Sequence, residues 1–193
     1  GATMTPLLVL DDVVAGWQQP ATTAVRLTLS AREIVGLTGP NGVGKSTLLA
    51  AVAGRAHVFA GVIQRAPAVS IALQTQDVPP VDGLPLTGRE LLARTGAGGK
   101  GLPPWLLDRL DTRLDRLSGG QRHYLALSAV LDTPADLVLL DEPTNNLDRA
   151  GVAHLIRHLR ELAESGRAIL VVSHDAAFVD AVCDRVIKLE PSD

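Results

Sequence analysis

The sequence predicts an α/β fold whose core is a mostly parallel sheet. Short apolar runs typical of strands recur along the 193 residues, with helical patterns between them. Two of these runs, 137–140 and 168–172, are almost continuously aliphatic, which is the pattern of strands buried on both faces of a parallel sheet. A glycine-rich turn after residues 33–38 leads directly into an Ala/Leu-rich helix.

Composition limits the class of protein before any motif is considered. Hydrophobic residues make up 46% of the chain, enough for a sizeable core in one domain, with or without a small subdomain, and this excludes wholesale disorder. The 18 basic and 21 acidic residues give a net charge of −3. A mildly acidic chain with 3% aromatic residues lacks both the basic surface and the stacking platform of a nucleic-acid binder, so we expect no direct nucleic-acid contact.

Membrane and secretion signals are also missing from the sequence. The longest apolar run, 48–53, ends at Gly54, far short of the roughly 18 residues that span a bilayer. No basic residue precedes an apolar leader, and the single Cys183 cannot form an internal disulfide. These features predict a globular cytoplasmic protein.

The elements follow in order along the chain. Apolar patterning predicts strands at 7–14, 25–29, 33–38, 61–65, 69–73, 137–140, 168–172 and 185–189, and helices at 45–53, 122–131 and 151–165. We expect 61–65 and 69–73 to form a hairpin or strand pair. The Pro- and Gly-rich segment 77–117, with a short helical stretch at 105–114, predicts a small helical subdomain inserted into a single domain that spans 4–193.

The turn after the third strand matches the phosphate-binding pattern G-x-x-x-x-G-K-[ST]. Strand 34–37 precedes it and helix 47–53 follows, which is the context that the motif requires. Its glycines let successive backbone N–H groups converge on a phosphate at a helix N-terminus. Lys45 would neutralise the β- and γ-phosphates, and the Ser46 hydroxyl would hold Mg²⁺. The residues expected to bind nucleotide here are Gly39, Pro40, Asn41, Gly42, Val43, Gly44, Lys45, Ser46 and Thr47.

Two carboxylates follow the buried strand 137–140. At the carboxyl end of a parallel strand, Asp141 and Glu142 would face a ligand crevice. Because successive strand residues point in opposite directions, Asp141 can serve a metal ion while Glu142 addresses the attacking water. Together with the phosphate loop, this pair predicts nucleotide hydrolysis.

The segment Leu117-Ser118-Gly119-Gly120-Gln121 lies just before that strand. With it, the chain resembles the ATP-binding-cassette (ABC) ATPases from about Leu7 onward. The phosphate loop, this LSGGQ signature, the acidic strand, the D-loop at 146–148 and a switch histidine in Val-Ser-His174-Asp occur in the order of that family. The resemblance implies a P-loop NTPase fold of ABC type, with an antiparallel β subdomain and a helical subdomain that is shortened here.

The resemblance also implies roles for particular residues. Glu142 would be the catalytic glutamate, His174 would contact the γ-phosphate, and Asp141 would bind the metal. Trp17 lies where the family places an aromatic residue that stacks on adenine. A loop glutamine that senses Mg²⁺ and water would be Gln76, favoured by its spacing to Leu86-Thr87, or Gln74. The residues of a second copy that would close over the nucleotide are Ser118, Gly119, Gly120, Gln121 and Asp148.

If the signature works as it does in the family, two chains pair head to tail around two ATP molecules, with Mg²⁺ as cofactor. The function favoured is the ATPase subunit of a transporter at the inner face of the cell membrane, with membrane-spanning subunits on separate chains. Residues 76–91 resemble the metal-ion importers, although a small-solute importer also fits. The alternative is a soluble ABC ATPase acting on ribosomes or nucleic acid, but the second cassette and charged linker of translation factors are missing from this sequence. A nucleotide kinase or GTPase would not need LSGGQ or the switch histidine.

Two further features have structural explanations. His154 and His158 have the i, i+4 spacing of a metal-binding pair, but no third ligand is evident, so we expect a solvated helix face. Cys183 has no basic neighbour in sequence and is expected to be structural.

Overall fold

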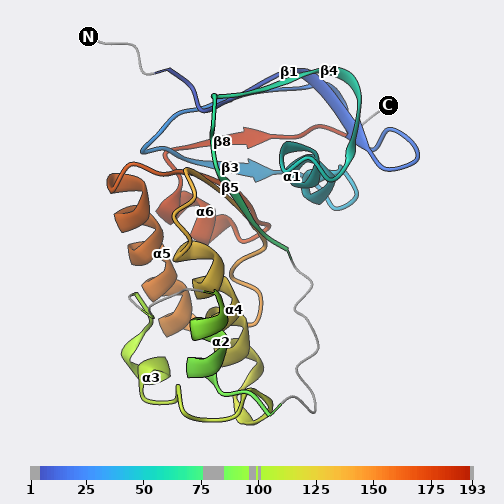
Figure 1. Ribbon diagram of the computed structural model, residues 1–193. Coiled ribbons are helices and arrows are strands. Elements are labelled where there is room, and N and C mark those ends of the chain that lie inside the picture. The colour runs from blue at the N-terminus through green and yellow to red at the C-terminus, as the bar shows by residue number, and fades with distance from the viewer. Residues whose placement is uncertain (1–4, 76–84, 96–98, 100, 192–193) are drawn as a thin grey trace.

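A computed structural model of the chain describes residues 5–75, 85–95, 99 and 101–191. It shows two sheets and a layer of helices (Figure 1). The strands are β1 (Leu8–Gly16), β2 (Val25–Leu29), β3 (Ile34–Thr38), β4 (His57–Arg65), β5 (Ile71–Gln74), β6 (Leu137–Asp141), β7 (Ala168–Val172) and β8 (Arg185–Lys188). The α-helices are α1 (Lys45–Val52), α2 (Gly88–Thr95), α3 (Pro104–Leu107), α4 (Gly119–Leu131), α5 (Arg149–Glu164) and α6 (Ala176–Val182).

The core is a parallel sheet of five strands in the order β5-β6-β7-β3-β8. Every residue of β6 and β7 is buried, which confirms the prediction that the two aliphatic runs are covered on both faces. The sheet brings the carboxyl ends of β3, β5 and β6 to one edge, where the phosphate loop and the acidic pair begin.

A second, antiparallel sheet of order β2-β1-β4 confirms the expected antiparallel part of the fold. Burial alternates along β2, as its sequence predicts. The prediction that 61–65 pairs with 69–73 is wrong, because β4 pairs with β1 whereas β5 pairs with β6 in the other sheet. Closeness in sequence favoured a hairpin, but the two strands pack against one core cluster while each forms its ladder with a strand distant in sequence, in a different sheet.

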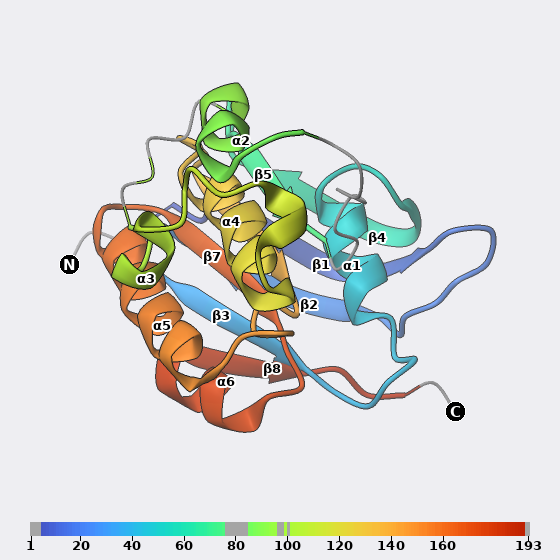
Figure 2. The same cartoon turned by 90° about the horizontal axis from the view of Figure 1, so that it is seen from below.

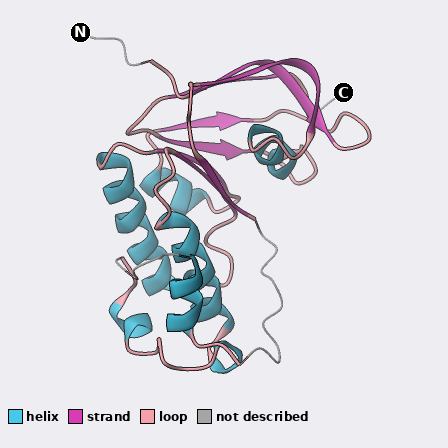
Figure 3. Cartoon of the chain, in the orientation of Figure 1, coloured by secondary structure: helices cyan, strands magenta, loops and turns pink. Residues whose placement is uncertain are grey.

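The helices divide between the two faces of the parallel sheet. Helix α1 packs between the two sheets, in a core cluster that it shares with β1, β2 and β3. Helices α4, α5 and α6 belong to the second core cluster on the opposite face (Figures 1 and 2). Figure 3 shows the same division, with the strands gathered at one end of the molecule and most helices at the other.

Side-chain caps explain where the helices begin. The start expected for the helix at 122–131 was three residues late, because Ser118 caps α4 and so its first turn includes the signature glycines. Asp148 likewise caps α5, which begins at Arg149 rather than at residue 151.

The helix predicted at 105–114 is wrong beyond Leu107, since the chain turns at 108–112 and forms only a short 3₁₀ turn at Leu114–Arg116. Among the described residues, none of the helices is long and apolar enough to cross a bilayer.

Candidate active site

The loop between β3 and α1 has the backbone of a phosphate cradle. Its three glycines have φ angles of 147° at Gly39, 84° at Gly42 and 93° at Gly44, a region that other residues rarely adopt. Gly44 also precedes α1 without a side-chain cap, so the first N–H groups of the helix are free of capping side chains. Such a loop can hold an anion with backbone N–H groups alone.

Close packing beneath the loop fixes its shape. A Cβ atom at Gly44 would lie 2.6 Å from the Thr22 side chain and 2.8 Å from the Ala21 carbonyl oxygen. Thr22 is buried, and its hydroxyl accepts a hydrogen bond of 3.0 Å from the Ala15 backbone N–H. Thr22 lies outside every sequence motif, so no pattern in the sequence signals its position under the loop.

The ammonium group of Lys45 lies against the loop that precedes it. It is only 8% exposed, and its Nζ donates to the carbonyl oxygens of Gly39 and, at 3.3 Å, of Pro40. Next to it, Ser46 is exposed and Thr47 is half-buried. The open side of the loop borders a small pocket of about 100 Å³. Its lining includes Pro40, Asn41, Gly42 and Val43.

At the end of β6 the structure brings Glu142 and His174 together. Glu142 is buried, and its Oε2 lies 2.9 Å from Nδ1 of His174 and accepts a 3.3 Å hydrogen bond from the His174 backbone N–H. Its own N–H donates to the Val172 carbonyl at 2.8 Å, and its φ angle is 51°. Asp141, the last residue of β6, is equally buried. Glu142 and His174 therefore lie in contact beside the sheet edge, and Asp141 is the residue before Glu142 in the chain.

Of the two candidate glutamines, Gln76 lies outside the described residues and Gln74 lies within them. Gln74 ends β5 and is paired with Leu140 of β6. Its Nε2 donates to the Thr75 carbonyl at 2.7 Å, while its buried Oε1 has no hydrogen-bond partner among the described residues. Either glutamine thus remains a candidate for the loop residue.

The signature segment opens α4 with a reciprocal cap. Ser118 Oγ accepts from the Gln121 N–H at 3.1 Å, and Gln121 Oε1 accepts from the Ser118 N–H at 2.9 Å. Gly119 faces open space, whereas a Cβ at Gly120 would lie 2.5 Å from the Asn146 carbonyl oxygen. A pocket of about 300 Å³ lies between this turn and the D-loop, lined by Trp105, Ser118, Gly120, Gln121, Asn146, Leu147 and Asp148.

The phosphate cradle and the signature segment form separate pockets. No residue is shared between the two linings, and α1 and α4 pack on opposite faces of the parallel sheet. Within one chain, therefore, Ser118 does not line the pocket beside its own cradle.

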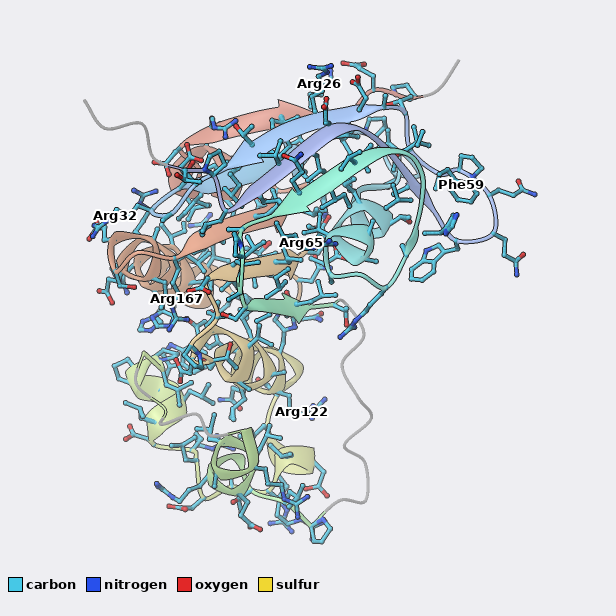
Figure 4. The ribbon with its side chains drawn as sticks, turned by 45° about the horizontal axis from the view of Figure 1, so that its top comes forward. Arg26, Arg32, Phe59, Arg65, Arg122 and Arg167 are labelled. Atoms are coloured by element: carbon cyan, nitrogen blue, oxygen red, sulfur yellow. The ribbon has the colours of Figure 1, made fainter. Side chains whose placement is uncertain are left out.

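An exposed aromatic side chain follows β1. Trp17 is 58% exposed, so its ring is accessible for stacking. Phe59 of β4 lies beside Gly16, at the edge of the small sheet (Figure 4).

Arg65 of β4 connects the small sheet to α1. Its guanidinium donates hydrogen bonds to the carbonyls of Ala51 and Val52, at the end of that helix (Figure 4).

The expectation that His154 and His158 form a solvated face is wrong. His154 Nε2 lies 2.6 Å from the Gly101 carbonyl oxygen, and His158 is buried beneath Gly101, 3.9 Å from Asp132. Gly101, which precedes α3, covers this face of α5. Helical periodicity within α5 cannot reveal such a contact.

Cys183 is partly buried. Burial raises the pKa of its thiol to about 11, in agreement with a structural role for that residue.

Because His158 is buried, we expect the free energy of unfolding to depend on pH. Burial, assisted by His154, lowers the pKa of His158, so the folded state resists protonation and loses stability as pH falls below about 6.5. Burial raises the pKa of Asp132, which acts in the opposite direction on acidification. We expect the Tm to fall less between pH 7.5 and 5.5 in His158→Gln, which keeps Asp132, than in the unmodified chain. Equal falls in calorimetric scans of both proteins would contradict this assignment.

The fold and the site define a class. A parallel sheet that leads through a glycine cradle into Lys45, with a neighbouring strand ending in two buried acids, is the arrangement of a P-loop nucleoside triphosphatase.

Comparison with known proteins narrows the class to a family. Residues 22–81 match the family model described as ABC transporter, and residues 104–180 match an AAA-domain model. The chain is 41% identical to the zinc import ATP-binding protein ZnuC of Cereibacter sphaeroides, over 86% of this chain and 71% of the relative. It is 34% identical to ZnuC of Paracoccus denitrificans, over 96% and 77% of the two chains. A solved ATP-binding subunit of an ABC transporter, 24% identical, matches 95% of this chain and 86% of its own with a TM-score of 0.78.

The chain belongs to the ATP-binding subunits of ABC transporters. It is an ATPase whose reaction is coupled to transport, and it binds ATP.

Proposed function

We propose that two copies of this chain hydrolyse Mg-ATP as a head-to-tail pair and so drive a zinc importer. The main support for this pairing is that the phosphate cradle and the signature turn of one chain line separate pockets, with α1 and α4 on opposite faces of the parallel sheet. The zinc assignment is supported by the 41% identity to a zinc import ATP-binding protein.

The cradle residues bind and orient the triphosphate. Lys45 Nζ, now bonded to two loop carbonyls, would exchange them for oxygens of the β- and γ-phosphates. A charged hydrogen bond of this kind is worth about 1.5–3 kcal/mol. The first N–H groups of α1, which no side chain caps, add a partial positive charge on the same side. Trp17 would stack on adenine.

The donors near the cradle suit Mg²⁺, which prefers oxygen ligands. The Ser46 hydroxyl is exposed at the start of α1, the Asp141 carboxylate ends β6, and α1 packs against β6. The buried, unpartnered Oε1 of Gln74 is a third oxygen, and Gln76 is the alternative by sequence. A bound Mg²⁺ would offset the negative charge of the phosphate oxygens. Ser46, Asp141 and one of the glutamines are thus proposed to hold it.

Glu142 is the proposed general base. Its carboxylate is fixed by Nδ1 and the backbone N–H of His174, so it can accept a proton from water without first reorganising. The His174 ring is 66% exposed, which leaves it free to meet the γ-phosphate. Loss of that phosphate on hydrolysis would release the contact.

The second copy would complete the site. Ser118 and the N-terminus of α4 would contact the γ-phosphate held by the partner's cradle, with Asp148 and the D-loop beside them. ATP would then favour the closed pair over separated chains because it binds both surfaces. The pair is proposed to attach to separate membrane-spanning subunits at the inner face of the cell membrane.

Zinc uptake in the source cell tests this function. Deleting the gene should abolish growth in chelator-treated medium, and added zinc, but not manganese, should restore it. The unmodified gene on a plasmid should also restore growth, whereas a copy with Glu142→Gln should not. Uptake of ⁶⁵Zn at the same rate in deleted and parental cells would contradict the zinc assignment.

A further inference from the structure

A buried histidine joins the signature helix to the catalytic segment. His123 lies in α4, five residues after Ser118, and is 4% exposed. Its Nε2 lies 2.8 Å from the carbonyl oxygen of Pro143, the residue directly after Glu142. A carbonyl oxygen can only accept, so the imidazole donates Nε2–H in this bond.

The segment that receives this bond has a constrained backbone. Glu142 and Asn146 have φ angles of 51° and 67°, both unusual for residues other than glycine. Such conformations persist only where the surroundings enforce them. On one side, the N–H of Glu142 is bonded to Val172 of β7. On the other side, α4 supplies the His123 bond and the close approach of Gly120 to the Asn146 carbonyl.

We infer that His123 is a positioning residue for hydrolysis, which fixes the backbone that carries Glu142 relative to the helix that Ser118 begins. The inference rests on the proposed function, in which Ser118 contacts the partner's nucleotide while Glu142 serves its own. The His123–Pro143 bond then links the two nucleotide sites: closure of α4 on one ATP sets the carboxylate at the other.

The test compares two substitutions at this position. His123→Leu removes the donor but keeps an apolar filler, whereas His123→Gln places an amide Nε2–H at a similar reach. We expect kcat for ATP to fall about tenfold in His123→Leu, because misplacing a catalytic group by less than 1 Å has costs of this order. KM for ATP should stay within twofold, and His123→Gln should recover at least half of the lost kcat.

A buried histidine elsewhere provides the matched control. His158 of α5 is similarly buried, and its Nε2 has no hydrogen-bond partner among the described residues. His158→Leu should lower the Tm but keep kcat within twofold. An unchanged kcat in His123→Leu would overturn the inference. So would a loss of kcat that glutamine does not restore, or one that His158→Leu reproduces at the same fall in Tm.

Failure of this inference is distinguishable from failure of the proposed function. If Glu142→Gln retains full turnover, the general-base assignment fails first. If Glu142→Gln is inactive while His123→Leu turns over normally, only the positioning role of His123 is overturned.

Discussion

Glu142→Gln should lower the steady-state ATPase rate at least about 100-fold while ATP binding remains, because a positioned general base contributes about 10²- to 10⁴-fold. The amide is nearly isosteric with the carboxylate, so the buried contact with His174 loses charge but little packing. Retained ATP should also hold the variant in the paired state. Phosphate release measures turnover, and light scattering with and without ATP measures the pairing.

The matched control is Glu164→Gln, which makes the same change on the exposed surface of α5. Its turnover should equal that of the unmodified chain. An ATPase rate in Glu142→Gln within threefold of the control would show that another group activates the water.

Lys45→Ala should weaken ATP binding by about 10- to 100-fold, the loss expected when one or two charged hydrogen bonds to phosphate are removed. The ammonium is buried in the cradle, and no other lysine or arginine belongs to the β3–α1 loop. Titration of a fluorescent ATP analogue gives the Kd. Lys188→Ala, an exposed lysine of β8, is the control and should bind ATP normally. An unaltered Kd in Lys45→Ala would remove this lysine from the phosphate site.

Elements whose conformation depends on residues adjacent in sequence were predicted correctly. Strand β2 was predicted over its full length from alternation, and β7 from its aliphatic run. The phosphate loop was predicted because its pattern places glycines at the three positions that have positive φ and because its flanking strand and helix are both visible in sequence. Glu142 and His174, which the resemblance singled out separately, lie in contact because the parallel strands β6 and β7 end at a common edge.

Partners distant in sequence were not predictable in the same way. The hairpin proposed for 61–65 and 69–73 is wrong because β4 pairs with β1, about 50 residues earlier in the chain. His158 was expected in solvent, but Gly101 and Asp132 cover it. The side chains of Thr22 and His123 each form a hydrogen bond with a backbone group of another segment, and no residue spacing signals such a contact.

Intermolecular cross-linking tests the head-to-tail pairing most directly. Two differently tagged proteins would share Glu142→Gln and Cys183→Ser, one adding Asn41→Cys in the cradle and the other Gly119→Cys in the signature. Asn41 is exposed, and a Cβ at Gly119 meets no atom within 4 Å, so both substitutions should be tolerated. We predict a disulfide between the two tags that forms with Mg-ATP and not with Mg-ADP. A disulfide that forms equally with both nucleotides, or not at all, would contradict the account.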